Sequence, residues 1–118
     1  MLKTTVLVMI LLTAASASYA DQSICDRLSK QAENEQIHFS PIEGYSVIGE
    51  GRLYFHSAPD AKCRTKDVFV IPKDHLMGYS EYKGWYSVMY VNPKTGEDFE
   101  GWVDSRRLEL TGTMGPKS

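Results

Sequence analysis

The side chains with the greatest capacity for chemistry are two cysteines, Cys25 and Cys63, and three histidines, His38, His56 and His75. A cysteine thiolate beside a histidine base can act as a nucleophile, and histidines can ligate a metal ion. These histidines are far apart in the sequence and lack a metal-ligand spacing such as His-x-x-x-His. The chemistry of the two cysteines therefore depends on the compartment in which the protein folds.

No other catalytic pattern accompanies these residues. The sequence has no Gly-x-Ser-x-Gly elbow and no phosphate-binding glycine loop. The acids Glu97, Asp98 and Glu100 lie in or beside a turn-rich stretch, where a solvated carboxylate is the default. We therefore expect a protein without enzymatic activity, cofactor or metal.

Residues 1–20 have the pattern of a signal peptide. Lys3 gives a weakly positive start, an unbroken apolar run covers 6–12, and small residues precede a cleavage point after Ala20, with Ala17 as the second choice. The run is too short for a permanent membrane span, which needs roughly 20 apolar residues. The sequence thus predicts a periplasmic or secreted protein with no membrane attachment after signal cleavage.

Export determines the expected oxidation state of the two cysteines. In an oxidising compartment a single pair favours a disulfide between Cys25 and Cys63, which would stabilise a domain this small. The alternative, a reactive cysteine served by one of the histidines, is disfavoured because exported thiol pairs usually oxidise to cystine. The formal net charge of −2 gives no broad basic face, and Arg106 and Arg107 are a pair rather than a patch, so we expect no nucleic-acid partner.

The remaining chain shows two different residue patterns. Over 22–35, apolar residues at Ile24, Leu28 and Ala32 recur every four positions, which predicts an amphipathic helix that Ser23 could cap. Beyond this helix and its connector (21–40), residues 41–110 hold short β-branched and aromatic runs between Gly- and Pro-rich turns, and we expect 111–118 to form a flexible tail. The fold class predicted is mainly β with an N-terminal α-helix.

Two tryptophans lie in short frames, Gly84-Trp85-Tyr86-Ser87-Val88 and Gly101-Trp102-Val103, separated by a turn-rich stretch at 92–96. These frames predict a β-hairpin. Alternation along its first strand places Trp85, Ser87, Met89 and Val91 on one face and Tyr86, Val88 and Tyr90 on the other.

With these frames in order, the stretch from Tyr45 to Leu110 resembles a bacterial SH3 domain. The Gly-Trp-x-x-Val frame at 84–88 and the Gly-Trp-Val frame followed by Leu108 are similar to the family's last strands. The run Leu53-Tyr54-Phe55-His56-Ser57-Ala58-Pro59 occupies the place of the family's Leu-Asn-Val-Arg-Ser-Gly-Pro, and the turn at 72–75 loosely matches its basic-Gly-acidic turn.

The resemblance implies a small SH3-like β-barrel with Val88 and Val103 in its core. It also implies a ligand groove bordered by Tyr54, Tyr82, Trp85 and Trp102. The alternative that both tryptophans mainly fill the core stays open, because small barrels need the volume of an indole.

Two binding functions are open. The resemblance to bacterial SH3 domains implies a module that binds peptidoglycan stem peptides or cross-bridges, which usually tethers an attached hydrolase to the cell wall. Because this chain shows no such attached domain, we expect stoichiometric binding of a protein partner, as an inhibitor or immunity protein against a secreted, cell-wall-degrading toxin or hydrolase, with peptidoglycan peptide as the alternative ligand.

The first prediction concerns export. Protein purified from the periplasm should begin at Asp21, because signal peptidase cuts after small residues such as Ala20. N-terminal sequencing measures this directly. An intact Met1 on protein recovered from the cytoplasm would contradict both the compartment and the reasoning about the cysteines.

Overall fold

The computed structural model describes residues 14–113, with side chains from residue 21 onward. One helix precedes seven strands and two short 3-10 helices. The elements are α1 (Ala14–Glu35), β1 (Ile37–Val47), β2 (Leu53–His56), η1 (Ala61–Cys63), β3 (Arg64–Val70), β4 (His75–Tyr82), β5 (Trp85–Val91), β6 (Asp98–Asp104), η2 (Ser105–Arg107) and β7 (Leu108–Thr113). The predicted mainly β class with an N-terminal helix is therefore confirmed.

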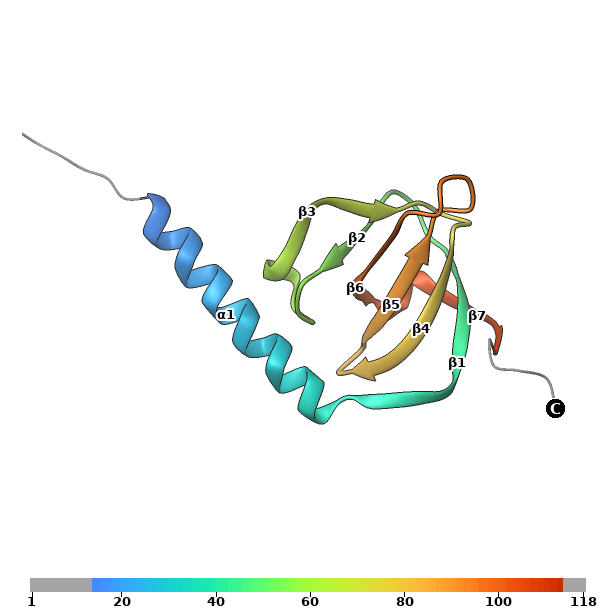
Figure 1. Cartoon of the computed structure of the whole chain (residues 1–118), viewed down its shortest axis with the longest axis horizontal. Helices are drawn as coiled ribbons and strands as arrows, with labels where there is room; N and C mark the ends of the chain where they lie inside the picture. Colours follow the sequence, from blue (N-terminus) through green and yellow to red (C-terminus); the bar gives the residue numbers. More distant parts are fainter. Residues whose placement is uncertain (1–13, 114–118) are drawn as a thin grey trace, which may run out of the picture.

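The seven strands form one antiparallel sheet in the order β3-β2-β6-β5-β4-β1-β7. The sheet curls around its core but stays open, since β3 and β7 are its two edges (Figure 1). A closed barrel, which the sequence predicted, is not formed. The last strand pairs with β1, so the sheet ends there without reaching β3.

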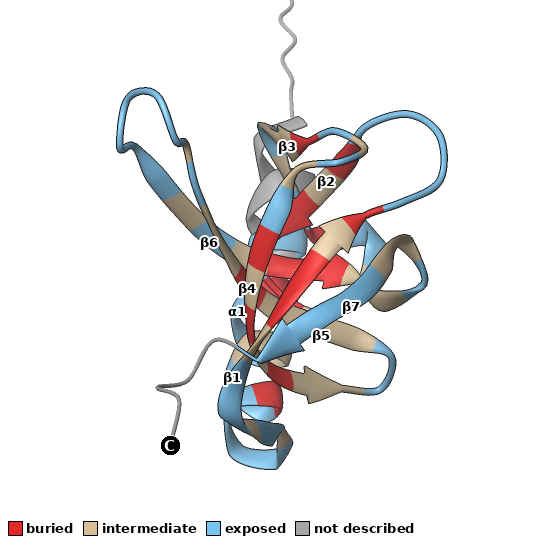
Figure 2. Cartoon of the chain, turned by 90° about the vertical axis from the view of Figure 1, so that its right-hand side faces the viewer, coloured by how far each residue is buried: buried red, intermediate tan, exposed pale blue. Residues whose placement is uncertain are grey.

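The concave face of the sheet holds the main core. Its seven buried residues come from β1 to β6, and the deepest of them, Val88 and Val103, are fully buried as predicted. The others are Val47, Leu53, Phe55, Val70 and Leu76. Figure 2 shows these segments in red along the middle of the sheet. Residues from almost every strand meet here because a curled sheet brings its inward-facing side chains together.

Two turns fix the register of the central strands. Lys83 and Gly84 both have positive φ, 48° and 86°, between the paired residues Tyr82 and Trp85, which is the geometry of a two-residue hairpin turn. Between β5 and β6, the backbone N–H of Asn92 donates to the carbonyl of Glu97 over 2.8 Å. The β5–β6 hairpin predicted from the sequence is confirmed.

Close packing of β2 on β6 explains one glycine. A Cβ at Gly101 would lie 2.9 Å from the carbonyl oxygen of His56 and 3.2 Å from the ring of Phe55. A side chain here would push β2 away from β6, where the register pairs only His56 with Trp102.

The helix α1 lies along one side of the sheet and joins it through the first half of β1 (Figure 1). The predicted apolar stripe faces inward, because Ala32 is fully buried and Ile24 and Leu28 are half-buried. The helix starts at Ala14 rather than near Ser23, because the alanine-rich residues before Asp21 continue it, so Ser23 lies inside the helix and does not cap it. Within residues 14–113, no helix is long and apolar enough to cross a membrane.

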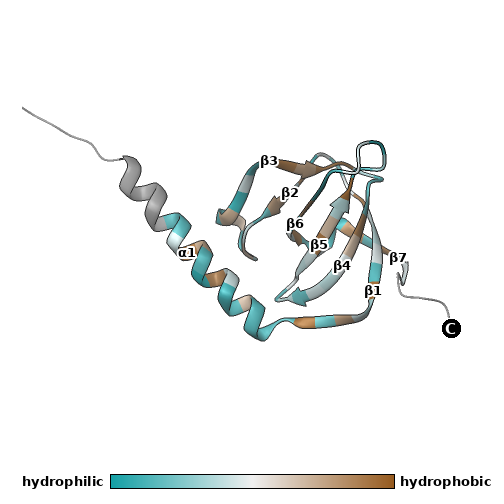
Figure 3. Cartoon of the chain, in the orientation of Figure 1, coloured by the Kyte–Doolittle hydropathy of each residue, from teal (hydrophilic) through white to brown (hydrophobic). Residues whose placement is uncertain are grey.

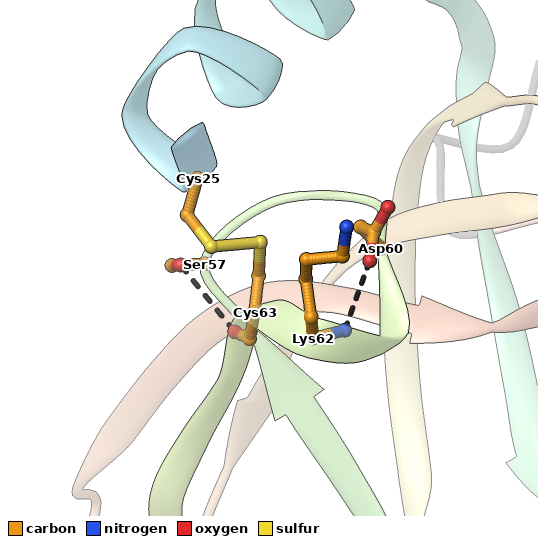
Figure 4. The surroundings of a disulfide bond; sticks show 5 residues. All are labelled: Cys25, Ser57, Asp60, Lys62 and Cys63. Atoms are coloured by element: carbon orange, nitrogen blue, oxygen red, sulfur yellow. Dashed lines mark hydrogen bonds between the residues drawn. A yellow bond between two sulfur atoms is a disulfide. The ribbon is translucent and has the colours of Figure 1, made fainter. Parts of the chain in front are cut away.

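The predicted disulfide between Cys25 and Cys63 is present, with a Cα–Cα distance of 5.7 Å (Figure 4). It joins α1 to η1, and its sulfur atoms pack with Ala58 and Leu28 in a small second core. Asp60 caps η1 by accepting from the N–H of Lys62 over 2.9 Å, which holds Cys63 in place.

At the other end of the chain, β7 continues to Thr113, so the first three residues of the predicted tail belong to this strand, and two of them, Gly112 and Thr113, pair with β1. Residues 114–118, and residues 1–13 of the predicted signal peptide, lie outside the described residues.

The second prediction tests the disulfide. The double variant C25S/C63S should lose up to about 4 kcal/mol of unfolding free energy, because the crosslink closes a 38-residue separation. Hydrogen exchange should rise over α1 first, since its contacts with the domain concentrate at η1. Exchange that stays slow over α1 in the double variant, with unchanged urea stability, would show that the helix is held by other contacts.

Candidate functional site

The convex face of the sheet, called the outer face below, carries the candidate site. Along β5, Tyr86, Val88 and Tyr90 pack on the core, so Trp85 and Ser87 point to the outer face, as the alternation predicted. Trp102 pairs directly with Ser87 and lies on the same face.

A cleft of about 450 Å³ lies between the end of α1 and this outer face. Its walls come from the helix and from six strands, β1 to β6, and its lining mixes aromatic, hydroxyl and acidic side chains. The lining residues include Glu33, Gln36, His56, Ser80, Glu100 and Trp102. The helix is joined to the domain at its disulfide and, just after its C-terminal end, by Gln36, and the cleft lies beside this C-terminal part.

The two predicted tryptophans lie diagonally across β5 and β6. Trp102 is only 6% exposed, although it borders the cleft, whereas Trp85 is half-buried. The Trp85 ring packs edge to face on the ring of His56, with centroids 4.7 Å apart. Trp102 therefore contributes mainly to packing, and Trp85 has the more accessible indole.

The two predicted tyrosines lie in different surroundings. Tyr82 pairs across the hairpin with Trp85, and its hydroxyl donates to Glu35 of α1 over 3.3 Å. Tyr54 lies on β2, where Phe69 and the guanidinium of Arg64 pack on its ring, the latter 4.2 Å from the ring centroid. The fold thus brings Tyr82, Trp85 and Trp102 together, and Tyr54 belongs to a neighbouring stack.

Residues that the sequence did not predict for this site complete the cleft. The Nδ1 of His56 lies 3.2 Å from the carbonyl oxygen of Trp102, and because a carbonyl only accepts, Nδ1 carries the proton. The hydroxyl of Ser80, itself 1% exposed, donates to Oε1 of Gln36 and so ties α1 to β4. Alternation along β2 could have placed His56 beside Trp102, but the contact of Gln36 with Ser80 joins segments that no local pattern relates.

A second, more apolar hollow of about 320 Å³ lies farther along the outer face. Met77 and Met89 line it together with Val91, which is 41% exposed. The hydroxyl of Tyr79 borders the first cleft and lies 3.6 Å from the sulfur of Met89. The two hollows are therefore neighbours on one surface, and methionine suits adaptable contacts there.

The start of β1, which follows the helix, also exposes apolar side chains. The start of β1 is brown in Figure 3, and its residues Ile37 and Ile42 are 66% and 36% exposed. Apolar side chains in this position extend the accessible apolar surface beside the cleft.

No cluster of three or more His, Cys, Asp or Glu side chains suited to a metal ion occurs within residues 14–113. Comparison of the chain with protein-family models, with curated proteins and with solved structures returns no match.

The third prediction follows from the environment of His56. Burial lowers the pKa of its imidazole below the ordinary value of 6.5, against the opposing effect of the carbonyls of Trp102 and Tyr54. The unfolded chain then binds more protons than the folded one as the pH falls through this range, so stability decreases. We expect the unfolding free energy to fall between about pH 7 and pH 5.

Urea unfolding across this range measures the effect, with two variants for comparison. H56Q should flatten the pH dependence, whereas H38Q, which alters an exposed histidine, should keep the slope of the parent protein. A parent-like slope in H56Q would contradict the assignment of the titrating group.

Proposed function

We propose that the protein is a non-catalytic binding protein of the periplasm or the extracellular space that acts by stoichiometric association with a protein partner. The most concrete role is that of an inhibitor or immunity protein directed at a secreted toxin or hydrolase that degrades the cell wall. The observation that carries the proposal is the outer face, on which an accessible Trp85, a polar cleft and a methionine-lined hollow adjoin one another.

This surface is suited to a protein partner for physical reasons. The concave face already supplies the core, so the apolar side chains on the outer face add nothing to the main core and remain available for contact. Tryptophan, tyrosine and methionine are enriched at interface centres because they bury much area with few rotatable bonds or with adaptable packing. The disulfide between Cys25 and Cys63 supports export, since such bonds persist in oxidising compartments.

We further infer that the curled sheet is an open variant of the bacterial SH3 arrangement. Supporting this are the burial of Val88 and Val103 and the outward placement of both tryptophans, which match what the resemblance implied. The helix α1 precedes that arrangement in the chain.

Binding of a peptidoglycan stem peptide or cross-bridge is the second candidate. The volume and polar lining of the cleft favour it, because a short peptide with amino and amide groups could lie there. Such a ligand would leave the methionine-lined hollow without a role.

The fourth prediction tests Trp85 as a contact. W85A should weaken binding of a partner captured from a periplasmic or toxin-bearing extract by roughly 2 kcal/mol, or about thirtyfold, while the fold stays intact. The matched variant W102A removes a buried indole and should instead cost about 3 to 5 kcal/mol of stability.

Two measurements are needed for each variant, urea unfolding and affinity for the captured partner. If W85A loses as much unfolding free energy in urea as W102A, Trp85 is mainly a core residue and not a contact. Retention on purified peptidoglycan, with no protein recovered from any extract, would reject the protein-partner proposal and favour the wall peptide.

A further inference from the structure

Two arginines and two aromatic rings form a stack at one edge of the sheet. The guanidinium carbon of Arg52 lies 4.2 Å from the ring centroid of Phe69, and that of Arg64 lies 4.2 Å from the ring centroid of Tyr54. The centroids of the two rings are 5.7 Å apart. These four residues, called the arginine stack below, come from β2, from the residue before it and from the edge strand β3. Both arginines are exposed, and both rings are half-buried.

The stack lies on the outer face of the sheet. Tyr54 and Phe69 are paired across β2 and β3. Leu53 and Phe55, on either side of Tyr54, are in the main core, as is Val70 after Phe69. Because side chains alternate along a strand, the two rings point away from the core and carry the two guanidinium groups with them.

The guanidinium donors of the stack are not used within the described part of the chain. Neither Arg52 nor Arg64 donates a side-chain hydrogen bond to a residue in the range 14–113, and the one ion pair there joins Arg106 to Asp104. The other arginine of the β domain, Arg107, donates to backbone carbonyls. Two of the four arginines beyond the helix are therefore satisfied by the fold, whereas the two in the stack are left for a ligand.

The rings position the two guanidinium groups without using their N–H groups. A cation is attracted to the face of an aromatic ring, whereas the hydrogen bonds of a guanidinium leave from its edge. A side chain that is already held in place loses less conformational entropy when a ligand binds. The stack therefore presents two preorganised donor groups whose geometry suits planar anions such as carboxylates.

We propose that the arginine stack binds aspartate or glutamate side chains of the protein partner. Arg52 and Arg64 lie at the two ends of the stack, so each can receive one carboxylate. This inference rests on the proposed function and names the chemistry of the partner at this edge of the outer face.

The stack is continuous with the surface around Trp85. His56 pairs with Arg64 across β2 and β3, and its ring packs on the ring of Trp85 with centroids 4.7 Å apart. A partner that covers the accessible indole therefore also reaches Arg64. Charged contacts around an aromatic centre are the usual arrangement of a protein interface.

The acids around the stack disfavour a long anionic polymer as the ligand. Asp21 and Asp26 of α1 line one hollow with Arg64, and Glu33 and Glu100 line the cleft. A polymer that carries a charge on every unit would meet these carboxylates wherever it extended beyond the stack. A folded partner avoids this repulsion, because it can place two acids at the stack and other side chains elsewhere.

The test uses small probes on the intact protein. The acetylated and amidated peptide Glu-Gly-Ser-Gly-Glu, titrated at millimolar concentration, should shift the NMR signals of the Arg52 and Arg64 Nε–H groups in a saturable manner. The matched neutral peptide Gln-Gly-Ser-Gly-Gln should not. Equal shifts with the neutral peptide, or no saturable shift with the acidic one, would overturn the proposal.

Charge variants locate the bound peptide. The double variant R52Q/R64Q should weaken binding of the acidic peptide by at least about tenfold, because the charge-assisted hydrogen bonds are lost. K30Q/K94Q is the matched control, since it removes the same charge at exposed residues of α1 and of the turn between β5 and β6. Urea unfolding confirms that both variants are folded. Equal weakening by K30Q/K94Q would reduce the effect to general charge and overturn the site.

A phosphate probe distinguishes a protein partner from an anionic wall polymer. An oligomer of glycerol joined by two phosphodiester groups carries the same charge as the acidic peptide, and it should bind no more tightly. Binding that is tenfold tighter than that of the peptide, and that R52Q/R64Q abolishes, would assign the stack to a phosphate polymer and overturn the protein-partner assignment.

The same variants separate this inference from the proposed function. If R52Q/R64Q still binds the captured partner as tightly as the parent protein, the inference fails, although partner binding itself stands. If no partner is captured from any extract but the acidic peptide binds at the stack, the proposed function fails while the carboxylate site stands.

Discussion

The disulfide between Cys25 and Cys63 is the constraint on which the candidate site depends. The helix α1 contacts the domain mainly at η1, where this bond joins them, and is held again near its C-terminal end by the contact of Gln36 with Ser80. The C-terminal part of the helix, with Glu33 and the following Gln36, borders the cleft. The crosslink that stabilises the small domain therefore also holds the helix that forms one wall of the candidate recognition surface.

The outer face is available because the sheet curls. Curling gathers the inward side chains of β1 to β6 into one core, so side chains on the opposite face such as Trp85 are not needed for the main core. The close approach of β2 to β6 over Gly101 tightens this curl and brings His56 beside Trp102 and Trp85. Backbone packing in the core thus sets the position of a buried imidazole on the other side of the sheet.

Charge on this face is divided between two neighbouring regions. The cleft presents the carboxylates of Glu33 and Glu100. Beside it, the stack on β2 and β3 holds two arginines against aromatic rings, with Arg52 4.2 Å from the ring centroid of Phe69. A net charge of −2 hides this division, since a sum over the chain carries no information about where the charges lie. Specificity for a partner can arise from such a pattern even where single ion pairs contribute little.

Local patterns in the sequence determined the helix stripe, most strands, the β5–β6 hairpin and the inward positions of Val88 and Val103, because alternation and turn chemistry act over a few residues. The sole cysteine pair likewise determined the disulfide. Only the tertiary structure decided that the sheet stays open, that Trp102 is buried while Trp85 is accessible, and that Gln36 meets Ser80. These outcomes depend on how α1, β2 and β6 pack over long sequence separations, and no short pattern encodes such contacts.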